Sequence, residues 1–450
     1  MGRQGALPFV FAMLLTVSSV AQQKTTQISL GQAIAIALER NIGIIQAENT
    51  LEVQESGQKA AYGDLLPSLS ASGHWSRDQI DKAATTQTFG GATFISPAEF
   101  SVTNSFGSSL SLGYTIFNGF ANTASLNRAR SGVNAAEQSL HRTRQQTAYQ
   151  TTQFYLNVLR TRELLKVQVE NVKRSKKQLE RIQEANRVGS LSLADVYRQQ
   201  VQAGNDELAM IQAQNEFDKG KADLAFYLAL NVMEEYDFSD PAVPFNIDTT
   251  EFNTMNDRYK NFSGLVEEAL KVRPDYRSAV ESYNIASSGV AVARAGHFPT
   301  ISAFASYGYG ANELSRLSDN RSSSWGLQIS FPIFSGFHVD NLVDQARVNE
   351  RNALEQLNQA ERQVQVDIKK ALLDLEAAEK QIEVTKKSVV SAEQDRRIAE
   401  EKYNLGAGTL LDLLVASANY VLAVSNKVNA AFNFNLVKTQ LEFSTGTLQY

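Results

Sequence analysis

The residue types that carry most enzyme and metal chemistry are sparse and scattered in this sequence. Cysteine is absent, which excludes disulfides, thiolate metal ligands, a cysteine nucleophile and a lipid anchor on an N-terminal cysteine. Phosphate-binding loops, nucleophile elbows and HExxH motifs do not occur. The histidines show no ligand spacing with a carboxylate; they are His74, His141, His297 and His338. We therefore expect no enzyme activity, no bound metal and no cofactor.

The start of the chain has the form of a secretory signal peptide, residues 1–21. Arg3 supplies the positive start, residues 6–20 are apolar, and Ser19 and Ala21 are small residues at cleavage spacing. A membrane anchor is the alternative, although the run is short for a span. The formal net charge of −5 gives no sign of nucleic-acid binding. We expect an exported protein.

The remaining chain consists of two similar halves. Leu38 corresponds to Leu270 with an offset of 232 residues, and Phe117 corresponds to Phe334 with an offset of 217. The difference of 15 indicates a longer loop before Phe117 in the first half. One architecture built twice is therefore expected, with repeat 1 at residues 22–230, a linker at residues 231–261 and repeat 2 at residues 262–450.

Each repeat contains two segments with strict alternation of apolar and polar residues. Such segments, roughly at residues 67–77, 105–117, 299–310 and 323–334, match transmembrane β-strands of about 10 residues. In the second of them Phe106, Leu110 and Leu112 share one face and Gly107, Ser109 and Ser111 share the other. A half-buried strand of a soluble sandwich is the alternative, but the chain offers no second sheet.

Two segments predict helices that are too long for a globular core. Residues 122–187 contain no proline and one glycine, and residues 341–404 contain neither. Either helix could extend roughly 95–100 Å at the usual helical rise. The second has apolar residues at alternating spacings of three and four, which is coiled-coil periodicity, including Val364, Ile368, Ala371, Leu375, Ala378 and Ile382. Narrow apolar seams on otherwise polar helices suit the wall of a hollow cylinder.

Four strands cannot close a barrel, and open sheet edges are not stable in lipid. Cyclic association of identical chains would remove the edges. Two chains would give eight strands and a barrel filled by side chains, whereas three chains would give twelve strands and an open lumen. A water-filled conduit therefore favours a homotrimer.

The ordered motifs resemble the TolC family of outer-membrane efflux proteins over essentially the whole mature chain. The motifs are the opening Leu30-Gly31-Gln32-Ala33, the strand starts at Pro67 and Pro299, the strand exits ending at Phe120 and Phe337, and the turns around Gly189 and Gly406. Each motif is weak alone, but their duplicated order is specific.

The resemblance implies a fold and partners. The fold class is an α+β membrane protein, with a long α-helical coiled-coil barrel and a transmembrane β-barrel of four strands per protomer, twelve in a trimer. The implied partners are a periplasmic adaptor, an inner-membrane pump of RND, ABC or MFS type, and outer-membrane lipid. The protein would lie in the outer membrane, extend into the periplasm, and serve as a passive exit duct for efflux or type I secretion.

The resemblance also assigns the two glycine turns to the periplasmic tip, near residues 189 and 406. A helix C-cap is certainly part of their role, because glycine permits the left-handed conformation that ends a helix. The functional expectation is docking of adaptor hairpins at Val188, Gly189, Ser190, Leu405, Gly406 and Ala407.

Three residues near these turns match the closed periplasmic gate of the family. Tyr403 matches a gate tyrosine and Asp195 its acceptor, so a phenol–carboxylate hydrogen bond is expected. Asp412 matches the first of two aspartate rings that would favour cations. The second ring position is Val415, and the gate arginine is replaced by Gly408, so the gate should be differently held. Compensation of a helix dipole is the alternative role for both aspartates.

A periplasmic coiled-coil tether or adaptor is the alternative function. An adaptor should have one helical hairpin flanked by small β-domains, whereas this sequence predicts two hairpins with amphipathic strands between helices. An enzyme is the third possibility, and the sequence offers no cluster of groups with perturbable pKa values.

Overall fold

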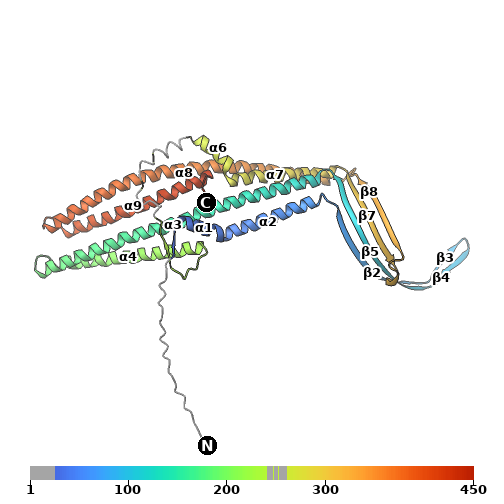
Figure 1. The fold of residues 1–450 in the computed structure, drawn as a ribbon, viewed down its shortest axis with the longest axis horizontal. Coiled ribbons are helices and arrows are strands. Elements are labelled where there is room, and N and C mark those ends of the chain that lie inside the picture. The colour runs from blue at the N-terminus through green and yellow to red at the C-terminus, as the bar shows by residue number, and fades with distance from the viewer. Residues whose placement is uncertain (1–25, 241–246, 248–251, 253–260) are drawn as a thin grey trace, which may run out of the picture.

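Long helices dominate the computed structural model, which describes residues 26–240, 247, 252 and 261–450. The helices lie side by side in one elongated bundle, and the main sheet extends from one end of it at an angle (Figure 1). None of the described helices is both long and apolar enough to cross a membrane. The expected signal peptide, residues 1–21, lies outside the described residues.

The helices of the two repeats correspond in order and length. Repeat 1 has α1 (Leu30–Arg40), α2 (Ile42–Gly63), α3 (Ala121–Arg187) and α4 (Leu193–Tyr227). Repeat 2 has α6 (Phe262–Val272), α7 (Pro274–Arg294), α8 (His338–Asn404) and α9 (Leu410–Thr445). Both α3 and α8 have 67 residues, so each extends about 100 Å. The pairs α3–α4 and α8–α9 form long helical hairpins, and α3 also packs against α7 and α9.

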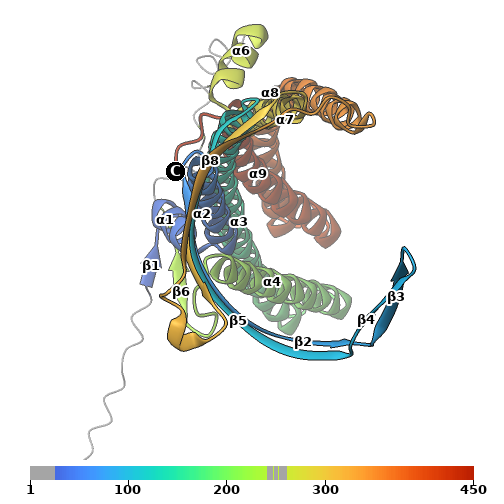
Figure 2. The same cartoon turned by 90° about the vertical axis from the view of Figure 1, so that its right-hand side faces the viewer.

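The main sheet contains four antiparallel strands in the order β2-β5-β7-β8. Their bounds are Ser68–Lys82 for β2, Glu99–Asn118 for β5, Thr300–Ala311 for β7 and Arg321–Ser330 for β8. Each repeat thus supplies one pair, and the two pairs join through β5 and β7. The sheet curves as an arc when viewed along the bundle, and β2 and β8 are its free edges (Figure 2).

The observed strand ends differ from the sequence prediction. Strand β8 ends at Ser330 instead of continuing to residue 334, and β2 and β5 are longer than predicted at their connected ends. Pro332 explains the first difference, because its ring nitrogen cannot donate a ladder hydrogen bond. The corresponding segment of repeat 1 has no proline, and β5 continues to Asn118.

Two short sheets were missed by the sequence analysis. Strand β1 (Thr26–Ile28) pairs in parallel with β6 (Tyr236–Phe238), which lies within the segment expected to be a linker. Strands β3 (Thr85–Phe89) and β4 (Ala92–Ser96) form a separate hairpin between β2 and β5. Both involve strands of three to five residues, too short to show a period.

The largest buried cluster joins the small β1–β6 sheet to the helices. Tyr155 and Val158 of α3, Leu224 of α4 and Phe238 of β6 are among its members. The Tyr155 hydroxyl donates a hydrogen bond of 2.9 Å to the carbonyl oxygen of Ile28. Burial raises the pKa of this phenol. A second cluster along α8 and α9 includes Ala371, Leu375, Ala378 and Ile382, the middle of the predicted coiled-coil seam.

Candidate functional site

The tips of the two helical hairpins are built by the same turn. At the first tip the Ser190 amide donates to the Ala185 carbonyl at 2.9 Å, and at the second the Ala407 amide donates to the Lys402 carbonyl at 2.8 Å. Gly189 and Gly406 have φ of 78° and 73°, so both turns use the left-handed conformation that glycine favours. These bonds give each long helix a Schellman-type end.

The predicted docking residues are exposed at these tips. Val188 retains 73% and Leu405 retains 83% of its accessible surface. The hydroxyl of Ser190 also donates to the Ala185 carbonyl, at 2.8 Å, which stiffens the first turn. A Cβ at Gly189 or Gly406 would meet no atom within 4 Å. The tips therefore present apolar side chains on rigid turns with open space around them.

An apolar cluster holds the two hairpins together just above the tips. Its buried members are Ile182 of α3, Val196 of α4 and Leu410 of α9, and Leu191, Tyr403 and Leu414 pack against them. Ile182 retains only 1% of its accessible surface. Because its members come from both hairpins, this cluster must separate if the hairpins move apart. We call it the tip cluster.

Tyr403 and Asp195 lie near each other but are not hydrogen bonded. The buried Tyr403 hydroxyl has no partner among the described residues. The Asp195 carboxylate accepts from the Ser192 hydroxyl at 2.7 Å and pairs with Arg198 at 3.4 Å. Burial raises the pKa of the Tyr403 phenol, and the charge of Asp195 raises it further. The expected phenol–carboxylate bond is thus absent from this single chain.

Asp412 lies in the first turn of α9 and is exposed. It forms a capping box with Thr409, whose hydroxyl donates to the carboxylate at 2.7 Å and accepts from the Asp412 amide at 3.2 Å. The hydrogen bonds from Thr409 hold the pKa of Asp412 below its ordinary value. The carboxylate therefore stays ionised at neutral pH. One turn further, Val415 is 52% exposed.

Gly408 lies in a crowded turn. A Cβ at this position would lie 3.0 Å from the Lys402 Cβ, which is closer than ordinary van der Waals contact. The α8–α9 turn therefore packs closely at Gly408.

A cationic group missed by the sequence analysis lies farther from the tips. The Arg174 and Arg396 guanidiniums lie 5.6 Å and 5.1 Å from the Tyr420 ring centroid. Arg396 pairs with Glu400 at 3.1 Å, and Arg181 reaches the same carboxylate at 3.6 Å. Burial lowers the pKa of Arg174, and the charge of Arg396 lowers it further. Glu400 thus connects α3 to α8.

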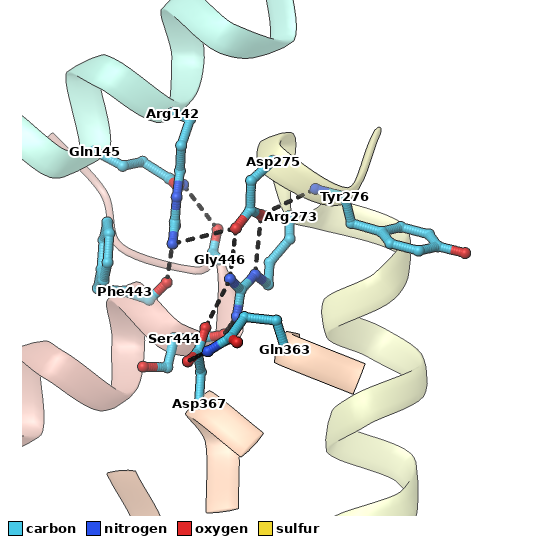
Figure 3. Close-up of polar contacts among 10 residues, drawn as sticks. All are labelled: Arg142, Gln145, Arg273, Asp275, Tyr276, Gln363, Asp367, Phe443, Ser444 and Gly446. Carbon is cyan, nitrogen blue, oxygen red and sulfur yellow. Dashed lines mark hydrogen bonds and ion pairs between the residues drawn. The ribbon is translucent and has the colours of Figure 1, made fainter. Parts of the chain in front are cut away.

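Near the middle of the bundle, a second charge cluster joins the end of α9 to three other helices (Figure 3). Arg273 retains 1% of its accessible surface and pairs with both Asp275 and Asp367. It also donates to the Ser444 carbonyl at 2.9 Å. Burial alone would lower the pKa of Arg273, but its hydrogen bonds with the two aspartates outweigh burial and raise the pKa above its ordinary value. We call this group the Arg273 cluster.

Arg142 adds a contact from α3 to the Arg273 cluster. Its guanidinium lies 3.8 Å from the Phe443 ring centroid and 3.4 Å from Asp275 (Figure 3). Burial lowers the pKa of Arg142 to about 10, although Asp275 opposes the change. Gly446 ends α9 with φ of 78°, and a Cβ there would lie 2.9 Å from the Arg273 Cγ. The Arg-Pro-Asp run at 273–275 is the only sequence signal for this cluster, and it is weak.

The two faces of the main sheet differ in chemistry. Trp325, Leu327 and Ile329 of β8 lie on one face and are 85%, 68% and 69% exposed. On the opposite face the hydroxyls of Ser72 and Ser109 are 2.8 Å apart, as are those of Ser306 and Ser324. An apolar face that stays exposed on an isolated chain implies a medium or partner that covers it.

The described residues contain no group of three or more His, Asp or Glu side chains able to hold a metal ion. The histidines make ordinary contacts: His141 lies 3.1 Å from the Tyr450 hydroxyl, and His297 lies 3.8 Å from Asp340.

Comparison with known proteins places the chain in a family. The sequence profile described as "Outer membrane efflux protein" matches residues 33–230 and 265–447. The outer membrane protein TolC of Vibrio cholerae is 23% identical over 329 residues, covering 72% of this chain and 73% of that protein. TolC of Escherichia coli is 25% identical over 321 residues, covering 68% of this chain but 63% of that protein, which is less than two thirds of its length.

Solved structures share the fold. The outer membrane channel CmeC of Campylobacter jejuni has a TM-score of 0.76 at 20% identity, with 93% of this chain and 85% of that chain covered. The open state of the MtrE outer membrane channel of Neisseria gonorrhoeae has a TM-score of 0.74 at 20% identity, with 99% and 98% covered. The long helical hairpins and the strand pairs of this chain therefore follow one known architecture.

Proposed function

Because this chain belongs to the outer membrane efflux protein family, we propose that it is the trimeric outer-membrane exit duct of an efflux or type I secretion system. Three protomers close a twelve-stranded barrel in the membrane, and their helical hairpins form a tunnel through the periplasm. Cargo passes through the tunnel without chemical change. The membrane barrel opens to the outside, and the hairpin tips face the inner membrane.

The observation that carries this proposal is the main sheet with its two free edges. Strands β2 and β8 each have one side without a strand partner in the described chain. One sheet face is apolar and exposed, and the other carries paired serines. In lipid every strand edge must be paired, so the sheet requires further copies of itself. Three copies also leave room for a water-filled bore.

The alternative of a periplasmic tether or adaptor is less well supported. The chain contains two long hairpins, α3–α4 and α8–α9, joined to one sheet. Its family consists of channels, and the profile covers both halves of the chain. A tether would leave the apolar sheet face in water without a function.

The periplasmic end closes through the tip cluster, against which Tyr403 packs, while Asp195 and Asp412 lie in the first turns of the adjoining helices α4 and α9. Three copies of the exposed, ionised Asp412 near the trimer axis favour cations at the entrance. Val188, Gly189 and Ser190 of one tip and Leu405, Gly406 and Ala407 of the other receive a periplasmic adaptor, which links the duct to an inner-membrane pump. Opening of the periplasmic end then requires that the two hairpins separate at the tip cluster.

The test is purification of residues 22–450 from membranes in detergent, followed by native mass measurement and recording in planar bilayers. The expected result is a trimer that inserts into bilayers and gives discrete conductance steps. A monomer that needs no detergent and conducts no ions would contradict the proposed function.

A further inference from the structure

We propose that the β3–β4 hairpin of each protomer packs against the β7–β8 loop of the neighbouring protomer. We call this contact the clasp, and in it the second copy of the chain covers the aromatic face of the hairpin. This inference rests on the trimer of the proposed function. The hairpin is the part of repeat 1 that breaks the similarity between the two halves. Repeat 2 connects its strands β7 and β8 only through residues 312–320.

A ribbon made of β2 and β5 alone carries the hairpin away from the sheet. The last pair between β5 and β7 is Phe106 with Ala311, whereas β2 and β5 remain paired from Ser76–Ser105 to Lys82–Glu99. These seven further pairs extend the ribbon by about 23 Å. Figure 2 shows the ribbon and the hairpin continuing the arc of the sheet beyond β7 and β8.

Along β2 the ribbon is polar where the sheet below it is apolar, and Val102 and Phe100 of β5 are the apolar residues on the same face of the ribbon. Trp75 and Phe106 are paired on the apolar face of the sheet, and the next residues on that face of β2 are Arg77, Gln79 and Asp81. Aromatic residues commonly mark the edge of the lipid-facing band of a membrane barrel. The ribbon therefore rises into water, and it separates the hairpin from the lipid-facing band.

The hairpin itself has no charge and exposes aromatic side chains. Residues 83–98 contain no Asp, Glu, Lys or Arg. Phe89 is 85% and Phe94 is 63% exposed. The register pairs Gln87 with Phe94 and Phe89 with Ala92, so the two phenylalanines share one face. An uncharged aromatic face in water needs a protein cover, because burying it is strongly favourable.

The neighbouring protomer is the surface that the ribbon reaches. β2 is a free edge of the sheet and meets the free edge β8 of the next copy when the barrel closes. The β7–β8 loop of that copy, residues 312–320, then lies beside the ribbon. This loop carries Leu314, which is 65% exposed, at the start of a short 3-10 helix. The clasp is thus continuous with the subunit interface and pairs Phe89 and Phe94 with an apolar loop residue.

The first experiment places a photoreactive benzoylphenylalanine at position 94 in membranes. The expected product is a two-chain adduct whose cross-linked peptide contains residues 312–320. The matched control is the same probe at Leu110, which lies on β5 between β2 and β7 of its own chain and should give no two-chain adduct. An adduct with lipopolysaccharide, an adduct within one chain, or no adduct would each overturn the clasp.

A second experiment measures the temperature at which the purified trimer dissociates. Phe89→Ser together with Phe94→Ser is expected to lower this temperature, whereas Ile95→Ser, on the opposite hairpin face, should leave it unchanged. Equal temperatures for all variants would overturn the clasp. Native mass of the same samples separates the two proposals: a trimer without the cross-link defeats only the clasp, and a monomer defeats the proposed function.

Discussion

At the scale of single residues, the tip region uses its acidic groups chiefly to begin helices. Asp195 and Asp412 both occupy the third position after a hydroxyl cap, Ser192 in one hairpin and Thr409 in the other. Capping and a role in the pore are compatible for Asp412, because its carboxylate remains exposed. Asp195 is different, since Ser192 and Arg198 already contact its oxygens.

Replacing Asp412 tests whether its negative charge influences the ions that pass through the pore. Asp412→Asn removes the charge and keeps a side chain of similar shape, so we expect a smaller preference for cations, read as a shift of the reversal potential in a potassium chloride gradient. Asp395→Asn, an exposed site on α8, is the control. A reversal potential equal to that of the unmodified channel would exclude Asp412 from the conduction path.

The same carboxylate predicts a pH dependence. The folded-state pKa of Asp412 lies below its ordinary value of 3.8, so its contribution to stability and its charge are both present above pH 3.8. Both are lost as the pH falls through the lowered pKa. Cation preference should therefore be the same at pH 7 and pH 5. A loss already complete at pH 5 would mean that other groups set the selectivity.

At the scale of elements, apolar packing holds the tips of the two hairpins against each other in this structure. The Tyr403 hydroxyl has no partner among the described residues, whereas its ring packs in the tip cluster with Ile182 and Leu410. Apolar contact between α3, α4 and α9 is thus the visible restraint. The link from Arg181 through Glu400 to Arg396 supports the same arrangement.

Two substitutions separate packing from hydrogen bonding at the tip. Ile182→Ala should destabilise the tip cluster by about 2–5 kcal/mol, because it removes a fully buried side chain. We expect a higher open probability in bilayers and greater antibiotic leak in cells. Tyr403→Phe should leave both nearly unchanged. If Tyr403→Phe had the larger effect and Ile182→Ala had little, the phenol–carboxylate hydrogen bond would be the main restraint instead.

The Arg273 cluster is the corresponding restraint in the middle of the bundle. Arg273→Ala leaves Asp275 and Asp367 without their buried partner, so a loss of about 3–5 kcal/mol is expected. Arg273→Lys should recover only part of it, because an ammonium cannot form the two-pronged contact. The measurement is thermal unfolding in detergent, with Arg347→Ala at an exposed position of α8 as the control. Equal melting temperatures for all variants would refute a structural role.

At the scale of the whole molecule, the main structural features lie at different positions along its length. The main sheet lies at one end, the Arg273 cluster lies in the middle of the bundle, and the exposed tips lie at the other end (Figure 1). The helices are restrained at the centre by charge pairs and at the tip by apolar contact.

An added positive charge is expected to have different effects on the two faces of the main sheet. Leu327→Arg on the apolar face of β8 should destabilise the membrane-inserted protein by about 2–4 kcal/mol if the side chain lies at the bilayer midplane. The amount of protein in the outer membrane should fall as a result. Gln328→Arg, one residue further along, faces the polar side and should insert normally with altered conductance. Membrane fractionation and bilayer recording check both. Normal insertion of the Leu327 variant would mean that this face does not meet lipid.

Much of the architecture follows from local pattern in the sequence. Alternation at period two marks β2, β5, β7 and β8, and the long runs without proline mark α3 and α8. The central seam residues from Val364 to Ile382 are buried as the three-four spacing predicts. The family assignment is confirmed by the matching profile. These features depend on residues close together in the chain, so one sequence suffices to find them.

Tertiary packing alone decided the contacts between distant residues. Arg142, Arg273 and Asp367 come from three helices and meet only because α3, α7 and α8 pack together. The Ser192–Asp195 spacing indicates a helix cap in the sequence, whereas the distance between Asp195 and Tyr403 depends on how α4 packs against α8. The β3–β4 hairpin likewise leaves no period, since five residues per strand are too few. Local periodicity determines elements, whereas partner choice depends on three-dimensional distances that the linear order does not contain.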